Sequence, residues 1–296
     1  MKKVIFVCTV VLMAVCPSVA GEPEGHVKGV VARILDNVAK MKAADPHAVP
    51  MAFWDFDGTI IKGDIGDGLL IDGQVAYRGL VDEVILGGFN PIYKGEEGVR
   101  QWRDDYHRMA KIGAWLSQGF DSQMFAGVSA EELDAFCAKT IAERRYADWY
   151  FASSMAIWKA LAEAGVENYV VSASIEALMR NAASTLGIPR DRIRATRVVQ
   201  EGGRWTTKIV QPIPYGEGKV DAVQEIVRAR PHGFAIAAFG NSYSTDAPFL
   251  RYVATQPSLP GGAKGTAMMI NGGKIVSGYS EHFICVGQDS VVGSLP

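Results

Sequence analysis

The stretch AFWDFDGTII, residues 52–61, places Asp55 and Asp57 at the end of an apolar, aromatic run. Such a run is typical of a short buried strand. Side chains alternate along a strand, so the two carboxyl groups are expected on the same side of the chain. Two adjacent carboxylates repel each other and need a cation or a shared proton. The stretch therefore predicts a buried strand that leads into a chemically active site.

Residues 151–296 continue with alternating strand-like and helix-like segments. This alternation predicts an α/β fold, a doubly wound and mostly parallel sheet covered by helices on both faces. Before the first strand, apolar residues at helical spacing from Val27 to Met41 predict an amphipathic helix. The later strands are expected at NYVVSAS (168–174), in a hairpin at RVVQEGGRWTTKIV (197–210), at GFAIAAFG (233–240) and, last, at TAMMING (266–272).

Residues 63–150 break this pattern. The stretch GDIGDGLLIDG (63–73) leads into helical segments at 102–115 and 129–145, and no strand alternation is visible. Ser129 and Glu132 form an S-x-x-E capping box, which marks the start of the second helix. We therefore expect a core domain of residues 21–62 and 151–296, with residues 63–150 inserted as a helical cap domain.

The first 20 residues have the features of a secretory signal peptide: two lysines, an apolar run and a small-x-small site ending at Ala20. Cleavage after Ala20 predicts a periplasmic or secreted protein, and no later apolar run is long enough to span a membrane. A lipoprotein anchored through Cys16 is the alternative, although bulky Val15 precedes that cysteine. The remaining Cys137 and Cys285 are either separate or joined by a disulfide.

The composition limits the classes of partner. With 48% hydrophobic and 21% charged residues, the chain differs from a disordered one. A formal net charge of −2 argues against non-specific nucleic-acid binding. Beyond that, the net charge says little about partners. The sequence does not indicate an oligomeric state.

Polar residues recur where the predicted strands end, which is where ligands bind in open α/β sheets. The candidates are Asp55 and Asp57 after the first strand, Ser172 in the second, Asn241 and Asp246 after GFAIAAFG, and Lys219 after a Gly-Glu-Gly turn, with Lys208 as the substitute for Lys219. The five histidines are scattered and lack the spacing of zinc ligands. Oxygen ligands from Asp and Asn suit Mg²⁺, which takes phosphate oxygens and water as its other ligands.

These residues lie in four segments that resemble, in order and spacing, the motifs of the haloacid dehalogenase (HAD) superfamily of phosphohydrolases. The segments are DFDGT (55–59), YVVSAS (169–174), GEGKVDAV (216–223) and GNSYSTDAPFL (240–250). The insert resembles the type-1 cap of the phosphoserine- and phosphocholine-phosphatase-like branch. The resemblance implies a Rossmann-like core with a helical cap, and a Mg²⁺-dependent phosphatase acting on a small phosphomonoester.

The resemblance also implies a role for each matching residue. Asp55 would be the nucleophile that forms an aspartyl-phosphate, and Asp57 the general acid and base. Ser172 and Lys219 would bind the phosphoryl group. The metal ligands would be Asp55, Asp57 through its backbone carbonyl, Asn241 and Asp246. One departure is visible, because the fourth motif usually begins with Gly-Asp and here begins with Gly240-Asn241, which is expected to weaken Mg²⁺ binding.

Alternatives remain open at this point. The same fold accommodates a phosphotransferase, and a non-catalytic member that binds a phosphorylated ligand would be consistent with Asn241. The acidic residues Asp64, Asp67 and Asp72 form either a solvated loop or a surface that repels anions or contacts an amine. The aromatic residues of the insert are expected mainly to pack its helices, and a cage for a quaternary ammonium is the other interpretation: Trp102, Tyr106, Trp115, Phe120, Trp149, Tyr150 and Phe151.

Overall fold

The computed structural model describes residues 23–257, 259–274 and 276–294. The predicted signal peptide, its cleavage point after Ala20 and the alternative anchor Cys16 lie outside these residues. Within them, no helix is both long and apolar enough to cross a lipid bilayer. Cys137 and Cys285 are not joined by a disulfide.

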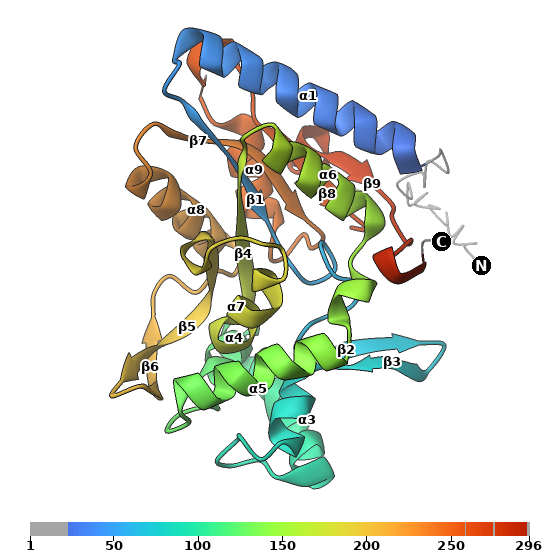
Figure 1. Cartoon of the computed structure of the whole chain (residues 1–296), viewed down its shortest axis with the longest axis vertical. Helices are drawn as coiled ribbons and strands as arrows, with labels where there is room; N and C mark the ends of the chain where they lie inside the picture. Colours follow the sequence, from blue (N-terminus) through green and yellow to red (C-terminus); the bar gives the residue numbers. More distant parts are fainter. Residues whose placement is uncertain (1–22, 258, 275, 295–296) are drawn as a thin grey trace, which may run out of the picture.

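A seven-stranded sheet forms the centre of the described chain, with the strand order β6-β5-β4-β1-β7-β8-β9 (Figure 1). All neighbouring strands are parallel except β5 and β6, which form the predicted antiparallel hairpin. This confirms the mostly parallel α/β fold. The strands are β1 (Val49–Trp54), β4 (Glu167–Ile175), β5 (Ile193–Glu201), β6 (Arg204–Val210), β7 (Gly233–Gly240), β8 (Thr266–Ile270) and β9 (Ile284–Val286). The last of these lies beyond TAMMING, which was expected to be the final strand.

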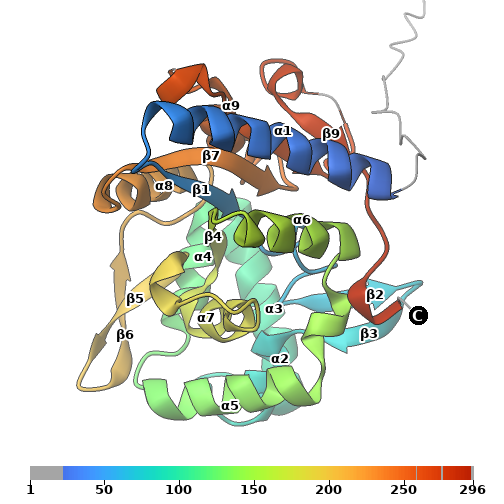
Figure 2. The ribbon, with the colours of Figure 1, turned by 45° about the horizontal axis from the view of Figure 1, so that its top comes forward.

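Both faces of the sheet are covered, as predicted (Figure 2). Alternate residues of β1 enter two separate cores, with Ala52 and Trp54 in one and Met51 and Phe53 in the other. This alternation is the two-residue period of a strand buried on both sides. The first core is closed by α1 (Pro23–Ala44), α6 (Ala152–Glu163) and α7 (Glu176–Ser184), and the second by α8 (Glu217–Ala229) and α9 (Ala247–Thr255).

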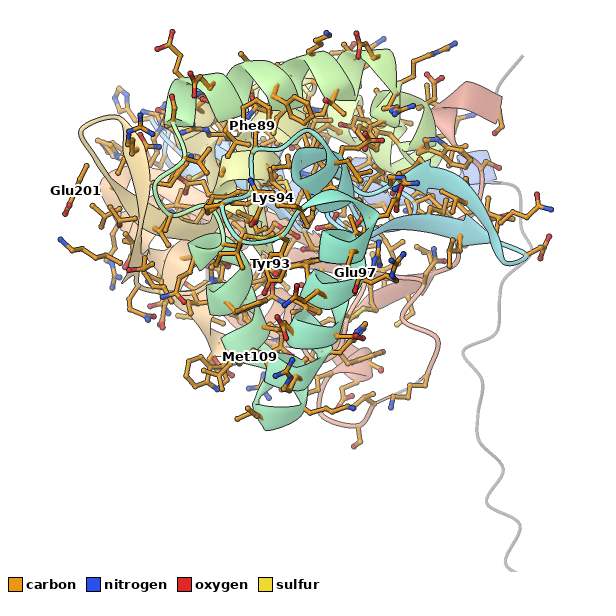
Figure 3. The ribbon with its side chains drawn as sticks, turned by 90° about the horizontal axis from the view of Figure 1, so that it is seen from below. Phe89, Tyr93, Lys94, Glu97, Met109 and Glu201 are labelled. Atoms are coloured by element: carbon orange, nitrogen blue, oxygen red, sulfur yellow. The ribbon has the colours of Figure 1, made fainter. Side chains whose placement is uncertain are left out.

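Between β1 and α6 the chain forms a largely helical insert, seen from its outer side in Figure 3. In that view Phe89, Tyr93 and Lys94 mark the loop between its first two helices, and Glu201 marks the tip of the β5–β6 hairpin. Ser129 accepts a hydrogen bond from the backbone N–H of Glu132, which confirms Ser129 as the N-cap residue of the predicted helix. The helices are α2 (Leu80–Leu86), α3 (Gly95–Ile112), α4 (Ala114–Gln123) and α5 (Ala130–Glu143).

The insert also contains a hairpin, β2 (Gly68–Ile71) and β3 (Gln74–Arg78), so the prediction of no strands in this region was wrong. Its turn is Asp72-Gly73, and both residues have positive φ angles, 51° and 77°. Asp-Gly between apolar runs is a strong signal for a two-residue hairpin turn. The pattern was hidden because Leu70 and Val75 are exposed, so no alternation of buried and polar residues marks the strands.

Candidate active site

Asp55 follows the last residue of β1 and lines a cavity of about 410 Å³. Its backbone N–H donates to the carbonyl of Phe239 in β7, which continues the sheet ladder up to the site. Its side chain is buried and accepts two hydrogen bonds, from Thr59 Oγ1 at 3.1 Å to Oδ2 and from Lys219 Nζ at 2.6 Å to Oδ1. The carboxyl group is thus held in one orientation at the wall of the cavity.

Lys219 reaches this position from the first turn of α8. Its side chain is fully buried, and Nζ also donates to Asp246 Oδ1 at 2.6 Å. Gly218 is needed beside it, because a Cβ there would lie 1.9 Å from the carbonyl oxygen of Ile213. Burial by itself lowers the pKa of Lys219, but the carboxylates of Asp246 and Asp55 raise it overall, so the ammonium form is favoured. Lys208, the substitute candidate, lies on β6 and pairs with Glu201 at the surface.

Asp246 and Asn241 occupy the turn between β7 and α9 but have different surroundings. Asp246 Oδ2 accepts the backbone N–H groups of Asn241 and Ser242, each at 2.9 Å, while Oδ1 binds Lys219. Both oxygens are therefore engaged, and the side chain does not line the cavity. Asn241 does line it and packs against Gly58, where a Cβ would lie 2.0 Å from its Nδ2 atom. Of the two residues, Asn241 is the one placed to meet a ligand.

Asp57 lies on the same wall and is held by two different segments. Its Oδ1 accepts the backbone N–H of Ile65 at 2.7 Å, and its Oδ2 accepts the hydroxyl of Ser174 at 2.5 Å. Burial raises its pKa well above the usual range, and the charges of Asp64 and Asp55 add to this rise. The direction of this shift is the one that the expected role of Asp57 as a general acid requires.

Ser172 lies in β4 and lines the same cavity, with 1% of its surface exposed. Its hydroxyl accepts the backbone N–H of Ser174 at 3.0 Å. The next helix begins at Glu176 with Ile175 at the N-cap, so Ser172 does not cap it. Ser174 was missed as a site residue. It lies two positions beyond Ser172 on the same strand, and the two-residue period alone could have indicated it.

Other side chains that line the cavity come from the insert and the loop that leads to it. Two of them, Gln118 and Asp121, were not singled out from the sequence, and two are among the seven aromatic candidates. The residues are Asp64, Asp67, Trp102, Tyr106, Gln118 and Asp121. Asp72 lies instead at the hairpin turn, and Trp115 is 55% exposed on another surface. The expectation that the aromatic residues mainly pack the fold holds for Trp102, Tyr150 and Phe151, each less than 5% exposed.

The electrostatics of Asp55 depend on its neighbours. Burial raises its pKa to about 7, the charge of Asp246 adds to the rise, and Lys219 and Thr59 oppose it. A cation bound beside Asp55 would therefore favour the ionised, nucleophilic form.

Among the described residues, no cluster of three or more His, Cys, Asp or Glu side chains is arranged for a metal ion. Asp55, Asp57 and Asn241, the residues whose oxygens the resemblance implies as ligands, all line the cavity, and an oxygen-only set of this kind fits Mg²⁺ completed by water and phosphate oxygens.

One family model and several solved structures match this chain. The sequence model of the haloacid dehalogenase-like hydrolase family matches residues 52–251, which include all four motifs, so the superfamily resemblance is confirmed. No curated protein sequence matches the chain.

Solved structures with a similar fold share little sequence with the chain. A protein of unknown function from Bordetella pertussis Tohama I has 17% identity and a TM-score of 0.59, covering 81% of this chain and 98% of its own. A functionally unknown protein from Anaerococcus prevotii DSM 20548 has 15% identity and a TM-score of 0.53, covering 82% and 85%. Cytosolic 5'-nucleotidase IIIB, bound to cytidine, has 14% identity and a TM-score of 0.51, covering 81% and 77%. These likenesses establish the shared fold.

Proposed function

Because this chain belongs to the haloacid dehalogenase-like hydrolase family, we propose that it is a Mg²⁺-dependent phosphatase of a small phosphomonoester. The observation that carries the proposal is the convergence of Asp55, Asp57, Ser172 and Asn241 on one cavity, with Lys219 buried against Asp55. A phosphoryl group needs a nucleophile, a proton donor and positive charge at one place, and these residues supply all three.

The proposed reaction has two halves. A carboxylate oxygen of Asp55 attacks phosphorus, the bond from phosphorus to the alcohol oxygen breaks, and Asp57 gives its proton to the leaving alcohol. Asp57 then takes a proton from water, whose oxygen attacks phosphorus and releases Asp55 and inorganic phosphate. The Ser172 hydroxyl, which lines the cavity, holds a phosphoryl oxygen during both halves, and Lys219, buried against Asp55, supplies positive charge.

Asp55, the backbone carbonyl of Asp57 and the side-chain oxygen of Asn241 would hold Mg²⁺, which supplies charge neutralisation for the phosphoryl oxygens. Asp246 is proposed to act without contacting the metal or the substrate. It keeps Lys219 in place and fixes the turn that carries Asn241. The neutral Asn241 is consistent with a metal that binds less tightly than at a site with a further carboxylate.

The experiment is phosphate release from p-nitrophenyl phosphate by the purified protein, with Mg²⁺ or with a chelator. We expect Mg²⁺-dependent release that is lost in Asp55→Asn and kept in Asp72→Asn, a matched change at the exposed hairpin turn. Acid-quenched protein should carry one phosphoryl group on the peptide that contains Asp55. Thermal stabilisation by phosphomonoesters without any turnover would overturn the proposal in favour of a non-catalytic binder. Transfer to added alcohols in place of water would identify a phosphotransferase.

We also propose that the protein is exported, on the evidence of the first 20 residues. N-terminal sequencing of the protein from a periplasmic or culture fraction should begin at Gly21. A cytoplasmic protein that retains Met1 would contradict this proposal.

A further inference from the structure

The cavity that contains Asp55 is lined by five carboxyl groups and, among the described residues, by no Lys, Arg or His side chain. Two of the five, Asp55 and Asp57, belong to the proposed phosphoryl-transfer site. The other three, Asp64, Asp67 and Asp121, lie on the wall formed by the insert and its leading loop. This wall would meet the part of the substrate that leaves as the alcohol.

The nearest cation to this wall is already engaged. Arg103 Nη2 donates to Asp82 Oδ2 at 2.8 Å, and its closest approach to the Asp67 carboxylate is a longer contact of 3.9 Å. Arg103 does not line the cavity. Asp64 uses Oδ1 to accept the backbone N–H groups of Gly66 and Asp67, so it shapes the loop as well as facing the cavity.

Asp121 is the most buried of the three acidic residues. It is 8% exposed, and its Oδ1 accepts the indole N–H of Trp102 at 2.9 Å. Within the described part of the chain no hydrogen bond reaches Oδ2, the oxygen left for a ligand in the cavity that Asp121 lines. Burial raises the pKa of this carboxyl well above its usual range, and Asp67 and Asp64 add to the rise. A carboxyl group in this position is stabilised by a cation that donates hydrogen bonds.

On the premise of the proposed phosphatase, we propose that the substrate is the phosphate ester of an amino alcohol that carries N–H donors and no carboxylate. Asp121 accepts a hydrogen bond from the ammonium group, and Asp64 and Asp67 supply further negative charge. The phosphate end lies beside Asp55 and Ser172, with the Lys219 ammonium buried behind the Asp55 carboxylate.

The same wall argues against three related substrates. An amino acid phosphate such as phosphoserine would bring a carboxylate against three acidic side chains, with no lining cation to receive it. A neutral alcohol would offer Asp121 Oδ2 at most an uncharged hydroxyl donor, without the charge assistance of an ammonium group. A quaternary ammonium has no N–H to donate, and the aromatic surface it would need is small, because Trp102 is 1% exposed and Arg103 lies over its ring at 5.5 Å.

The test compares kcat/KM for phosphoethanolamine, phosphocholine, phosphoserine and 2-hydroxyethyl phosphate, which is the neutral analogue of the first. We expect phosphoethanolamine to exceed 2-hydroxyethyl phosphate by roughly tenfold or more, since a buried charge-assisted hydrogen bond has about that effect. In Asp121→Asn, which keeps an acceptor for Trp102, the preference should fall to within about twofold, mainly through KM. Asp67→Asn provides a second variant, expected to reduce the preference in the same direction.

Asp104→Asn is the matched control, because Asp104 lies on α3 as an exposed acid outside the cavity. It should keep the wild-type preference. Equal rates with phosphoethanolamine and its neutral analogue, or a preference unchanged in both Asp121→Asn and Asp67→Asn, would overturn the inference. Hydrolysis of p-nitrophenyl phosphate is measured alongside. If the protein hydrolyses this substrate but shows no preference for phosphoethanolamine, only the inference about the substrate fails. If it hydrolyses no phosphomonoester at all, the proposed phosphatase function itself fails.

Discussion

The Nζ atom of Lys219 lies 2.6 Å from Oδ1 of Asp246, and both side chains are shielded from solvent. The same ammonium donates to Asp55, so one buried cation connects the proposed nucleophile to the turn after β7.

In Lys219→Met two buried carboxylates would face each other without a cation. We expect a loss of about 3–5 kcal/mol in the free energy of unfolding, measured by urea denaturation. Lys208→Met, which breaks an exposed pair with Glu201, should cost less than about 1 kcal/mol; equal losses would contradict the importance of burial.

Alanine substitutions at Gly58 and Gly73 distinguish the effect of backbone strain from the effect of a side chain that displaces a site residue. Both have φ near +70°, but a Cβ at Gly58 would lie 2.0 Å from Asn241 Nδ2, while nothing lies within 4 Å of a Cβ at Gly73. Each change to alanine should cost about 1 kcal/mol of stability from the left-handed backbone. Only Gly58→Ala should also weaken Mg²⁺ binding, because it displaces Asn241. Calorimetric titration with Mg²⁺ checks this, and equal binding by both variants would contradict it.

Asn241 offers a neutral oxygen where the related motif has a carboxylate. Asn241→Asp adds a negative ligand of nearly the same shape, so we expect tighter Mg²⁺ binding, by roughly tenfold. Asn241→Ala removes the oxygen and should weaken binding. Calorimetry with Mg²⁺ alone gives both values without reference to activity. If Asn241→Asp bound Mg²⁺ no more tightly, Asn241 would not be a ligand.

Ser174 donates a hydrogen bond to Asp57 Oδ2, and this bond lowers the pKa of a carboxyl that burial raises. Its loss in Ser174→Ala should raise that pKa further. Since the rate falls when a general acid loses its proton, the alkaline limb of the kcat profile should move to higher pH. Ser184→Ala, an exposed serine that bonds within its own helix, should leave the profile unchanged. A shift toward lower pH in Ser174→Ala would argue against Asp57 as the acid.

Asp121 is expected to make stability depend on pH. Its pKa in the folded protein is raised, mainly by burial, so its contribution is fully present below the unfolded value near 3.8 and is lost as pH rises through the folded value. Asp121→Asn does not ionise. The variant should therefore gain thermal stability over wild type as pH increases from 4 to 8, by about 2 °C or more at the upper end. A difference that is constant with pH would show that Asp121 keeps its ordinary pKa.

The order of strands and helices could be predicted from the sequence because it depends on local periodicity. The residues of β1 and β7 are apolar without interruption, as a strand buried on both faces requires, and the segments before α8 and α9 end in turn residues. The parallel arrangement then brings Asp55, Ser172 and Asn241 to one edge of the sheet. The β2–β3 hairpin was not predicted, because its apolar residues are exposed and its Asp-Gly turn is the one sequence signal that marks it.

The sequence by itself indicated that Asp55, Asp57, Ser172 and Asn241 reach one site, since each follows or ends a strand of predicted direction. Only the tertiary structure decided which hydrogen bonds and ion pairs their side chains make. Whether Asp246 or Asn241 faces the cavity depends on which donors lie within hydrogen-bond distance, and Lys219 and two backbone N–H groups engage Asp246. Likewise, Asp121 joins the site from α4 only because the insert packs over the sheet. Packing between segments distant in sequence has no local periodicity, so side-chain partners of this kind are not visible in the sequence.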